Sequence, residues 1–282
     1  MITIRASSLS SYCDCPRRTV ARTQRAIVQA AGYTLRTTPT SIAAPVGTGV
    51  HAGAARLLID KMHGLAIDQH DALDAAVEAF RGALSESEVL TDSTTPNNNT
   101  AEQQIARMLH AVAVGLVPFV DPVMVEERLV AQYADDIAVS GQGDNLCRVA
   151  LPTNSAGLRD FKTGVRQGAH RPQFGTYALL YRSHDIDVSQ AVTDFVQRVP
   201  LSKPQPLVVS TVHDVAGCET AARRVLDHFT EGLRLFTEGD EDRDFVPGDP
   251  WAFPANPSSQ MCSEKYCAAF GTEFCKEHKE TK

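Results

Sequence analysis

The feature that most constrains the fold is a change in the spacing of apolar residues near Pro122. Before Pro122 the pattern is typical of amphipathic helices, which we expect at 16–38, 71–84 and 101–117, while 45–62 reads as a glycine-containing turn that runs into another such helix. After it, β-branched residues alternate with polar ones, and we expect strands at 123–133, 136–150 and 156–164. The rest of the pattern predicts a helix at 171–185, strands at 190–199 and 206–213, and a helix at 218–236. This order predicts an α/β fold with a mixed central sheet flanked by helices.

Composition narrows the class of protein. Of the 282 residues, 43% are hydrophobic and 22% are charged, which is typical of a globular protein with a real core, and we expect one domain over 1–282. No stretch reaches the apolar length of a membrane helix, and the first residues lack the apolar centre of a signal peptide. We therefore expect a cytoplasmic protein with no membrane partner. The net charge of −7 argues against a broadly basic surface but leaves room for a local basic groove.

The segment GLRDFKTG (157–164) places an acid and a lysine two positions apart. Side chains alternate along a strand, so Asp160 and Lys162 are expected to project together while Phe161 turns into the core. By itself this pattern is also compatible with an ordinary surface ion pair, which contributes less than about 1 kcal/mol.

A second acid changes the interpretation. Asp144 ends the segment GQGD on the preceding predicted strand, so two adjacent strands can bring it close to Asp160. Two neighbouring carboxylates repel each other unless a cation lies between them, and oxygen ligands suit Mg²⁺ or Mn²⁺. Lys162 beside such an ion can orient a water molecule while the ion neutralises a phosphate. These are the groups that phosphodiester hydrolysis requires.

The motifs GQGD, LRDFKTG and QFGTY, in this order, resemble the PD-(D/E)xK nuclease superfamily, in particular the branch of the RecB nuclease domain, Cas4 and many phage exonucleases. Upstream, GTGVH resembles the histidine motif of that branch, and VEERL resembles its strand with an additional acid. The resemblance implies a restriction-endonuclease-like core, which we place at 45–236.

The resemblance also implies roles for individual residues. The metal ligands would be His51, Asp144, Asp160 and the backbone carbonyl of Phe161, with Glu126 as a further acid for which the adjacent Glu127 is a rival. Lys162 would position the attacking water. Gln173 and Tyr177, one helical turn apart, would support Lys162 and guide the DNA strand.

Cysteines cluster at both ends of the chain. The tail CSEKYCAAFGTEFC contains Cys262, Cys267 and Cys275, and the N-terminal segment CDCPRR supplies Cys15, with Cys13 as the alternative. The same nuclease branch often holds a [4Fe–4S] cluster with one cysteine before the nuclease core and three after it. We therefore expect segments 1–40 and 247–282 to be joined by such a cluster, although four thiolates can also bind Zn²⁺.

The resulting hypothesis is a Mg²⁺- or Mn²⁺-dependent DNA exonuclease that acts on single strands or duplex ends, in recombination, phage DNA metabolism or CRISPR spacer processing. A helicase or a CRISPR adaptation protein could be a partner as a separate chain. The alternative is a non-catalytic nucleic-acid-binding or zinc-stabilised adaptor protein that retains the fold. Four basic residues near the N-terminus are candidates for phosphate contacts: Arg17, Arg18, Arg22 and Arg25.

Overall fold

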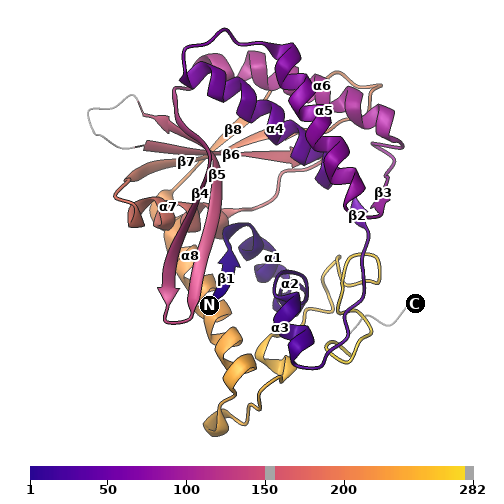
Figure 1. Cartoon of the computed structure of the whole chain (residues 1–282), viewed down its shortest axis with the longest axis vertical. Helices are drawn as coiled ribbons and strands as arrows, with labels where there is room; N and C mark the ends of the chain where they lie inside the picture. Colours follow the sequence, from indigo (N-terminus) through magenta and orange to yellow (C-terminus); the bar gives the residue numbers. More distant parts are fainter. Residues whose placement is uncertain (150–155, 277–282) are drawn as a thin grey trace.

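The computed structural model describes residues 1–149 and 156–276. Two predicted segments extend beyond them: residue 150 of the strand 136–150 and residues 277–282 of the cluster-binding tail lie outside the described residues. The described chain forms a six-stranded mixed sheet flanked by helices (Figure 1), as the sequence predicts. Its strands are β1 (Ile2–Arg5), β4 (Pro122–Ala134), β5 (Ile137–Arg148), β6 (Ala156–Gly164), β7 (Val188–Gln197) and β8 (Val209–His213).

The sheet forks at β5. Along one edge, β5 pairs antiparallel with β4 over nearly its whole length. Along the other edge it is shared: residues 137–140 pair in parallel with β1, and residues 145–148 pair antiparallel with β6. Residues 141–144 lie between these two partners, so this part of the edge faces neither β1 nor β6. Strands β7 and β8 extend the sheet beyond β6.

Three helices cover one face of the sheet (Figure 1): α4 (Ala43–Met62), α5 (Gln69–Ser85) and α6 (Asn98–Gly115). Their apolar sides pack with Phe161 and Val196 of the sheet in one hydrophobic cluster. α6 ends before the short 3₁₀ turn η2 (Val117–Phe119) because Pro118 cannot continue the helix. The loop between α5 and α6 contains the short strand β3 (Val89–Leu90), which pairs with β2 (Thr40–Ser41) and was not expected from the polar sequence.

The opposite face is covered by α7 (Arg171–Ser183) and α8 (Val215–Glu238). A second hydrophobic cluster joins these two helices to the N-terminal helices α1 (Leu9–Asp14), α2 (Pro16–Thr23) and α3 (Arg25–Ala30) and to cysteine-containing parts of the tail. Figure 1 shows the yellow tail beside these indigo helices, so the two ends of the chain meet. The remaining elements are three 3₁₀ turns: η1 (Ala6–Ser8), η3 (Glu241–Arg243) and η4 (Pro250–Ala252).

The prediction of one helix over 16–38 is wrong. Gln24 leaves the helical conformation, with φ −119° and ψ 34°, and separates α2 from α3. The helix ends at Ala30, and Gly32 then takes a φ of 94°, which reverses the chain at little steric cost because glycine has no side chain. The segment predicted to lie outside the nuclease core also contributes β1 to the central sheet.

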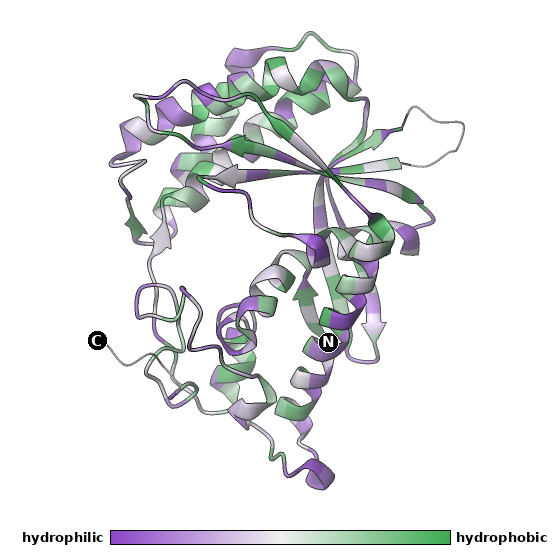
Figure 2. Ribbon diagram, turned by 180° about the vertical axis from the view of Figure 1, so that it is seen from behind, coloured by the Kyte–Doolittle hydropathy of each residue, from purple (hydrophilic) through white to green (hydrophobic). Residues whose placement is uncertain are grey.

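The helices carry both hydrophobic and hydrophilic residues, as expected of elements that bury one side only (Figure 2). Among the described residues, no helix combines the length and apolar character needed to cross a bilayer.

Candidate metal centre and active-site pocket

A cavity of about 340 Å³ opens at the fork of the sheet. The unpaired stretch of β5 contributes to it, since a strand without a neighbour on one edge leaves room for side chains and solvent. The cavity is lined mainly by polar residues of β1, η1, β4, β5, β6, α4 and α7: Arg5, Ala6, Ser7, His51, Glu126, Arg128, Ser140, Gly141, Gln142, Asp144, Asp160, Lys162, Gln173 and Tyr177. The five residues that the sequence predicts to be catalytic therefore all line this cavity: Asp144, Asp160, Lys162, Gln173 and Tyr177.

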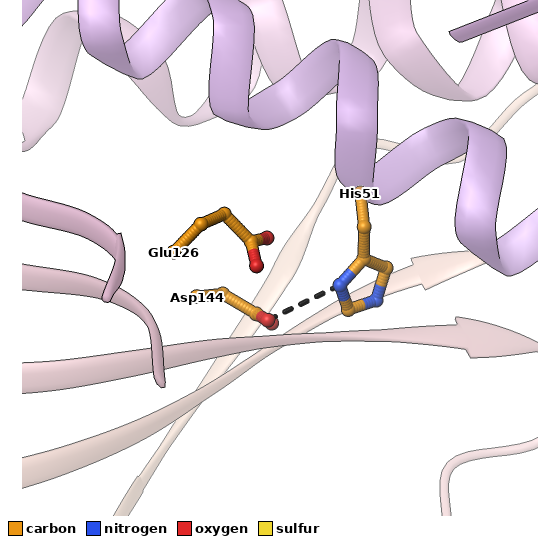
Figure 3. A group of neighbouring side chains, drawn as sticks. All are labelled: His51, Glu126 and Asp144. Carbon is orange, nitrogen blue, oxygen red and sulfur yellow. Dashed lines mark hydrogen bonds and ion pairs between the residues drawn. The ribbon is translucent and has the colours of Figure 1, made fainter. Parts of the chain in front are cut away.

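Three side chains form a compact group in this cavity (Figure 3). His51 extends from α4 toward Asp144, and Glu126 lies beside both. One ligand atom of each lies within 4.8 Å of the others. The Nδ1 atom of His51 is 3.2 Å from Oδ1 of Asp144. An imidazole and two carboxylates at this spacing form a donor set that suits a divalent cation.

Glu126 reaches this group because of an unusual backbone conformation. It stands opposite Asp144 in the β4–β5 register, between the pairs Val125–Asn145 and Glu127–Gly143. Its φ of 54° is in the left-handed region, which costs a non-glycine residue roughly 1–3 kcal/mol and is typical of functional sites. The rival Glu127 is exposed and does not line the cavity.

Gln142 holds Glu126 in place. Its Nε2 donates a hydrogen bond of 2.6 Å to Oε2 of Glu126, and its Oε1 accepts one of 3.5 Å from Arg128, the residue paired with it across the strands. Because both ends of the amide are engaged, its orientation is defined, and it fixes the Glu126 carboxylate.

Asp160 and Lys162 project from β6 into the same cavity, while Phe161 is buried between the sheet and α4. Lys162 Nζ forms an ion pair of 2.5 Å with Oδ2 of Asp160. Asp160 is 1% exposed, and the Lys162 ammonium is the described partner of this oxygen. A carboxylate has more acceptor sites than one such partner uses, so Asp160 can still bind a metal ion. Asp160 shares the cavity with the compact group but lies outside its 4.8 Å limit.

The Asp144 carboxylate also joins the two arms of the fork. Its Oδ2 accepts a hydrogen bond of 2.5 Å from the backbone N–H of Phe161, just beyond the last β5–β6 pair. In an extended strand the N–H and C=O of one residue point to the same edge. The Phe161 carbonyl is therefore directed toward the fork, the direction required of a metal ligand.

The acids of the cavity perturb one another. Burial, followed by the charge of Asp144, raises the pKa of both Asp160 and Glu126 to about 7. Burial disfavours a charged His51, but the adjacent Asp144 carboxylate outweighs it and raises the pKa of His51 to about 9. Without a cation the acids are accommodated only by taking up protons, and a divalent ion would replace those protons. The donor set thus fits a bound Mg²⁺ or Mn²⁺.

Gln173 and Tyr177 lie one turn apart on α7, where Nε2 of Gln173 donates a 2.7 Å hydrogen bond to the Tyr177 hydroxyl. Both are buried. Burial and the Asp160 and Asp144 carboxylates hold the pKa of Tyr177 well above its usual value. The phenol therefore remains protonated and can donate a hydrogen bond inside the cavity.

Glycines set the approach of α4. A Cβ on Gly47 would lie 2.8 Å from the Thr163 hydroxyl of β6, so only glycine allows α4 this close to the sheet. Because Gly47 is one turn before His51, the close approach brings the imidazole to Asp144. Gly49 and Gly53 similarly allow α5 to pack closely. A Cβ added at these positions would lie 2.7 and 2.8 Å from backbone carbonyl oxygens of α5.

None of the four arginines proposed for phosphate binding lines the cavity. Arg17 is 3% exposed and donates a hydrogen bond of 2.9 Å to the Phe253 carbonyl. It is therefore placed to stabilise the tail instead of contacting phosphate. Arg18 forms a 2.9 Å ion pair with Asp14, and Arg25 donates to carbonyls of residues 35 and 36. Arg22 is exposed on α2.

The arginines that do line the cavity, Arg5 and Arg128, were missed in the sequence, as was Gln142. No spacing rule marks them, because they come from different strands that meet only through pairing with β5. The one available signal was the position of Gln142 inside GQGD.

The cysteines from the two ends of the chain line a second, small cavity. Its walls include Cys15, Cys262, Cys267 and Cys275. Cys13 is exposed and does not line it. Burial raises the pKa of Cys267 to about 11, and the three other thiols of the cavity add to this effect. Four thiols that share a buried cavity have the chemistry of a soft metal site.

Several solved structures are similar to this chain. A putative exonuclease from Eubacterium rectale aligns with 83% of this chain and 80% of its own, at 10% identity and a TM-score of 0.50. SSO0001 aligns with 80% of this chain and 76% of its own, at 11% identity and a TM-score of 0.34. An alkaline exonuclease from Laribacter hongkongensis (LHK-Exo) aligns with 65% of this chain and 91% of its own, at 12% identity and a TM-score of 0.28. No curated protein matches the chain.

The family model of the PD-(D/E)XK nuclease superfamily matches residues 3–270, which is nearly the whole chain. The matched region contains both the cavity at the fork and the strand that carries Asp160 and Lys162. The restriction-endonuclease-like fold expected from the sequence is confirmed with it. This chain belongs to the PD-(D/E)XK nuclease superfamily.

Proposed function

We propose that the protein is a Mg²⁺- or Mn²⁺-dependent DNA exonuclease that hydrolyses phosphodiester bonds in single strands or at duplex ends. The observation that carries this proposal is the compact group of His51, Glu126 and Asp144 in one cavity with Lys162. A non-catalytic binding protein would have no need to keep these groups together.

In this proposal His51, Glu126, Asp144 and Asp160 hold the divalent ion, assisted by the carbonyl of Phe161. When bound, the ion neutralises the phosphate and lowers the pKa of a coordinated water. Lys162, held by its ion pair with Asp160, orients the attacking water and favours its deprotonated form. Gln173 and the protonated Tyr177 supply hydrogen-bonding groups on the α7 side of the cavity. These groups would support Lys162 and guide the DNA strand.

Metal removal tests the proposal. End-labelled single-stranded and duplex DNA should be shortened by the protein in Mg²⁺ or Mn²⁺, because the acids repel a phosphate unless a cation is present. A chelator should abolish this activity, and excess metal should restore it. Degradation that continues unchanged in the chelator, or no degradation in any divalent metal, would refute the proposed reaction.

We further propose that Cys15, Cys262, Cys267 and Cys275 hold a [4Fe–4S] cluster, as in the RecB/Cas4-like branch of the superfamily. The shared cavity of these four thiols supports the proposal. The cluster would tie α1 and α2 to the tail. Closing a loop of this length contributes about 5 kcal/mol if the cluster acts as a covalent cross-link.

Zinc is the alternative occupant, because four thiolates can also bind Zn²⁺ tetrahedrally. We favour the iron–sulfur cluster because of the resemblance to the RecB/Cas4-like branch, and the metal content of the purified protein distinguishes the two.

Single substitutions of the cysteines provide the test. Cys267→Ser and Cys15→Ser should lose bound iron and become less soluble, because each removes one of four ligands from a buried site. Cys13→Ser is the matched control and should keep its iron, since Cys13 is exposed outside the cavity. Iron content and visible absorbance of proteins purified without oxygen report the result. Iron retained in Cys267→Ser, or zinc in its place, would contradict the cluster.

A further inference from the structure

Two arginines line the cavity at the fork together with its acids. Arg5 is the last residue of β1, and Arg128 is in β4. Their partners in the sheet are Ser140 and Gln142, which are only two positions apart on β5. Since β1 and β4 lie on opposite edges of β5, the two Cα atoms are separated by about two strand spacings, roughly 10 Å. The arginines therefore flank the unpaired stretch of β5 at which the cavity opens.

Neither guanidinium is neutralised by an acid within residues 1–149 and 156–276. Both residues are exposed, and neither forms an ion pair with a described residue. The only described side-chain contact of Arg128 is the 3.5 Å hydrogen bond to Gln142, which leaves most of its donors available. By contrast, other arginines of the chain are bound to carboxylates, for example Arg159 to Asp194 and Arg198 to Asp92.

The local fold fixes both positions. Ser8 donates a 2.6 Å hydrogen bond to the carbonyl of Arg5, at the point where β1 turns into η1. Gln142 connects Arg128 to Glu126. The backbone of Arg5 and the side chain of Arg128 are thus held at defined places beside the acids.

The charge of the cavity shows why they are needed. Glu126, Asp144 and Asp160 contribute three negative charges when ionised. A divalent ion and Lys162 together contribute three positive charges, so the loaded metal centre is close to neutral. A neutral centre does not attract a polyanion, and Arg5 and Arg128 supply the two positive charges that do.

We propose that Arg5 and Arg128 bind phosphates of the DNA strand that adjoin the scissile bond, and that they supply much of the affinity of this site for a nucleic-acid strand. The inference rests on the proposed nuclease function and deepens it, because it assigns substrate binding to residues on β1 and β4. It replaces the helical arginines suggested by the sequence. The resulting charge pattern suits a phosphodiester backbone and does not read its bases.

The test is binding of a fluorescent single-stranded oligonucleotide with Ca²⁺ in place of Mg²⁺, measured by anisotropy over a range of salt concentrations. Arg5→Ala and Arg128→Ala should each weaken binding about 10-fold, the loss expected for one charge-assisted contact. Each should also reduce, by about 0.7, the slope of the logarithm of the binding constant against the logarithm of the salt concentration. This is the value for one phosphate contact on a single strand. Lysine at either position should restore most of the affinity, because it keeps the charge.

Arg224→Ala is the matched control: Arg224 is an exposed arginine of α8 outside the cavity, and its removal should change neither quantity. Mn²⁺ affinity, measured by calorimetry, should stay within about twofold of wild type in Arg5→Ala and Arg224→Ala, which separates DNA binding from metal binding. Binding by Arg5→Ala and Arg128→Ala equal to that of Arg224→Ala, or no DNA binding by the wild type, would overturn the inference. The nuclease proposal would fail on a different observation, namely that the wild-type protein does not cleave DNA in Mg²⁺ or Mn²⁺.

Discussion

Lys162→Ala should lower DNA hydrolysis by about 10²- to 10⁴-fold, the contribution typical of a positioned group that assists proton transfer. The lysine ammonium lies 2.5 Å from Asp160 in the cavity of the acids. The variant should remain folded. Burial already raises the pKa of Asp160 to about 7 with the lysine present, so the buried carboxyl can take up a proton when its partner is removed.

Measurements of metal affinity distinguish a catalytic role of Lys162 from a structural one. Removing a positive charge beside three acids should leave Mn²⁺ affinity unchanged or make it tighter, while single-turnover cleavage falls. Lys203→Ala removes an exposed lysine outside the cavity and should behave as wild type. If Lys162→Ala degrades labelled DNA at the wild-type rate, Lys162 has no part in the chemistry. If its melting temperature collapses, the loss of activity reports unfolding instead.

Gly175→Ala should cost about 3 kcal/mol of folding free energy or more, at the upper end of the range for an overpacked core. A Cβ at this position of α7 would lie 2.0 Å from the carbonyl oxygen of Cys218 in α8. The obstructing atoms belong to backbone, so no flexible side chain can move aside and the two helices must separate. Because Gly175 lies between Gln173 and Tyr177, the shift should also reduce activity.

Gly82→Ala is the matched control for this prediction. Gly82 lies within α5, and nothing stands within 4 Å of a Cβ placed there. Alanine should therefore stabilise the protein by about 0.5–1 kcal/mol, because it restricts the unfolded chain more than glycine does. Denaturant unfolding of both variants and the wild type gives the comparison. Equal stability of Gly175→Ala and wild type would show that α7 and α8 pack less closely than described.

The sequence was sufficient for most elements of the fold. Periodicity predicts α5 and α8 within a few residues, because their apolar faces repeat with helical spacing against a core. It failed at 16–38, where the Gln24 side chain donates to the Thr3 carbonyl of β1 and the Tyr33 hydroxyl donates to the Gly248 carbonyl, long-range contacts that local preference does not encode. It also failed to indicate the short strands β2 and β3, which contain only two residues each.

The candidate site was predictable as far as its acids, its lysine and its histidine. These residues belong to short motifs whose strand or helix spacing itself places their side chains, so Asp160 and Lys162 project together in any extended β6. Gln142 escaped notice because its importance is its hydrogen bond to Glu126, which depends on the pairing of β4 with β5.

The sequence by itself determined the class of chemistry, because residue types and their local spacing set which groups can hold a cation and orient a water. Only the tertiary structure decided that Glu126 and not Glu127 joins the cavity, since a single φ of 54° turns that residue inward. It also decided that the arginines of the cavity come from β1 and β4 instead of the N-terminal helices. The physical reason is the fork at β5: which strands meet there is set by long-range hydrogen bonding that no local pattern encodes.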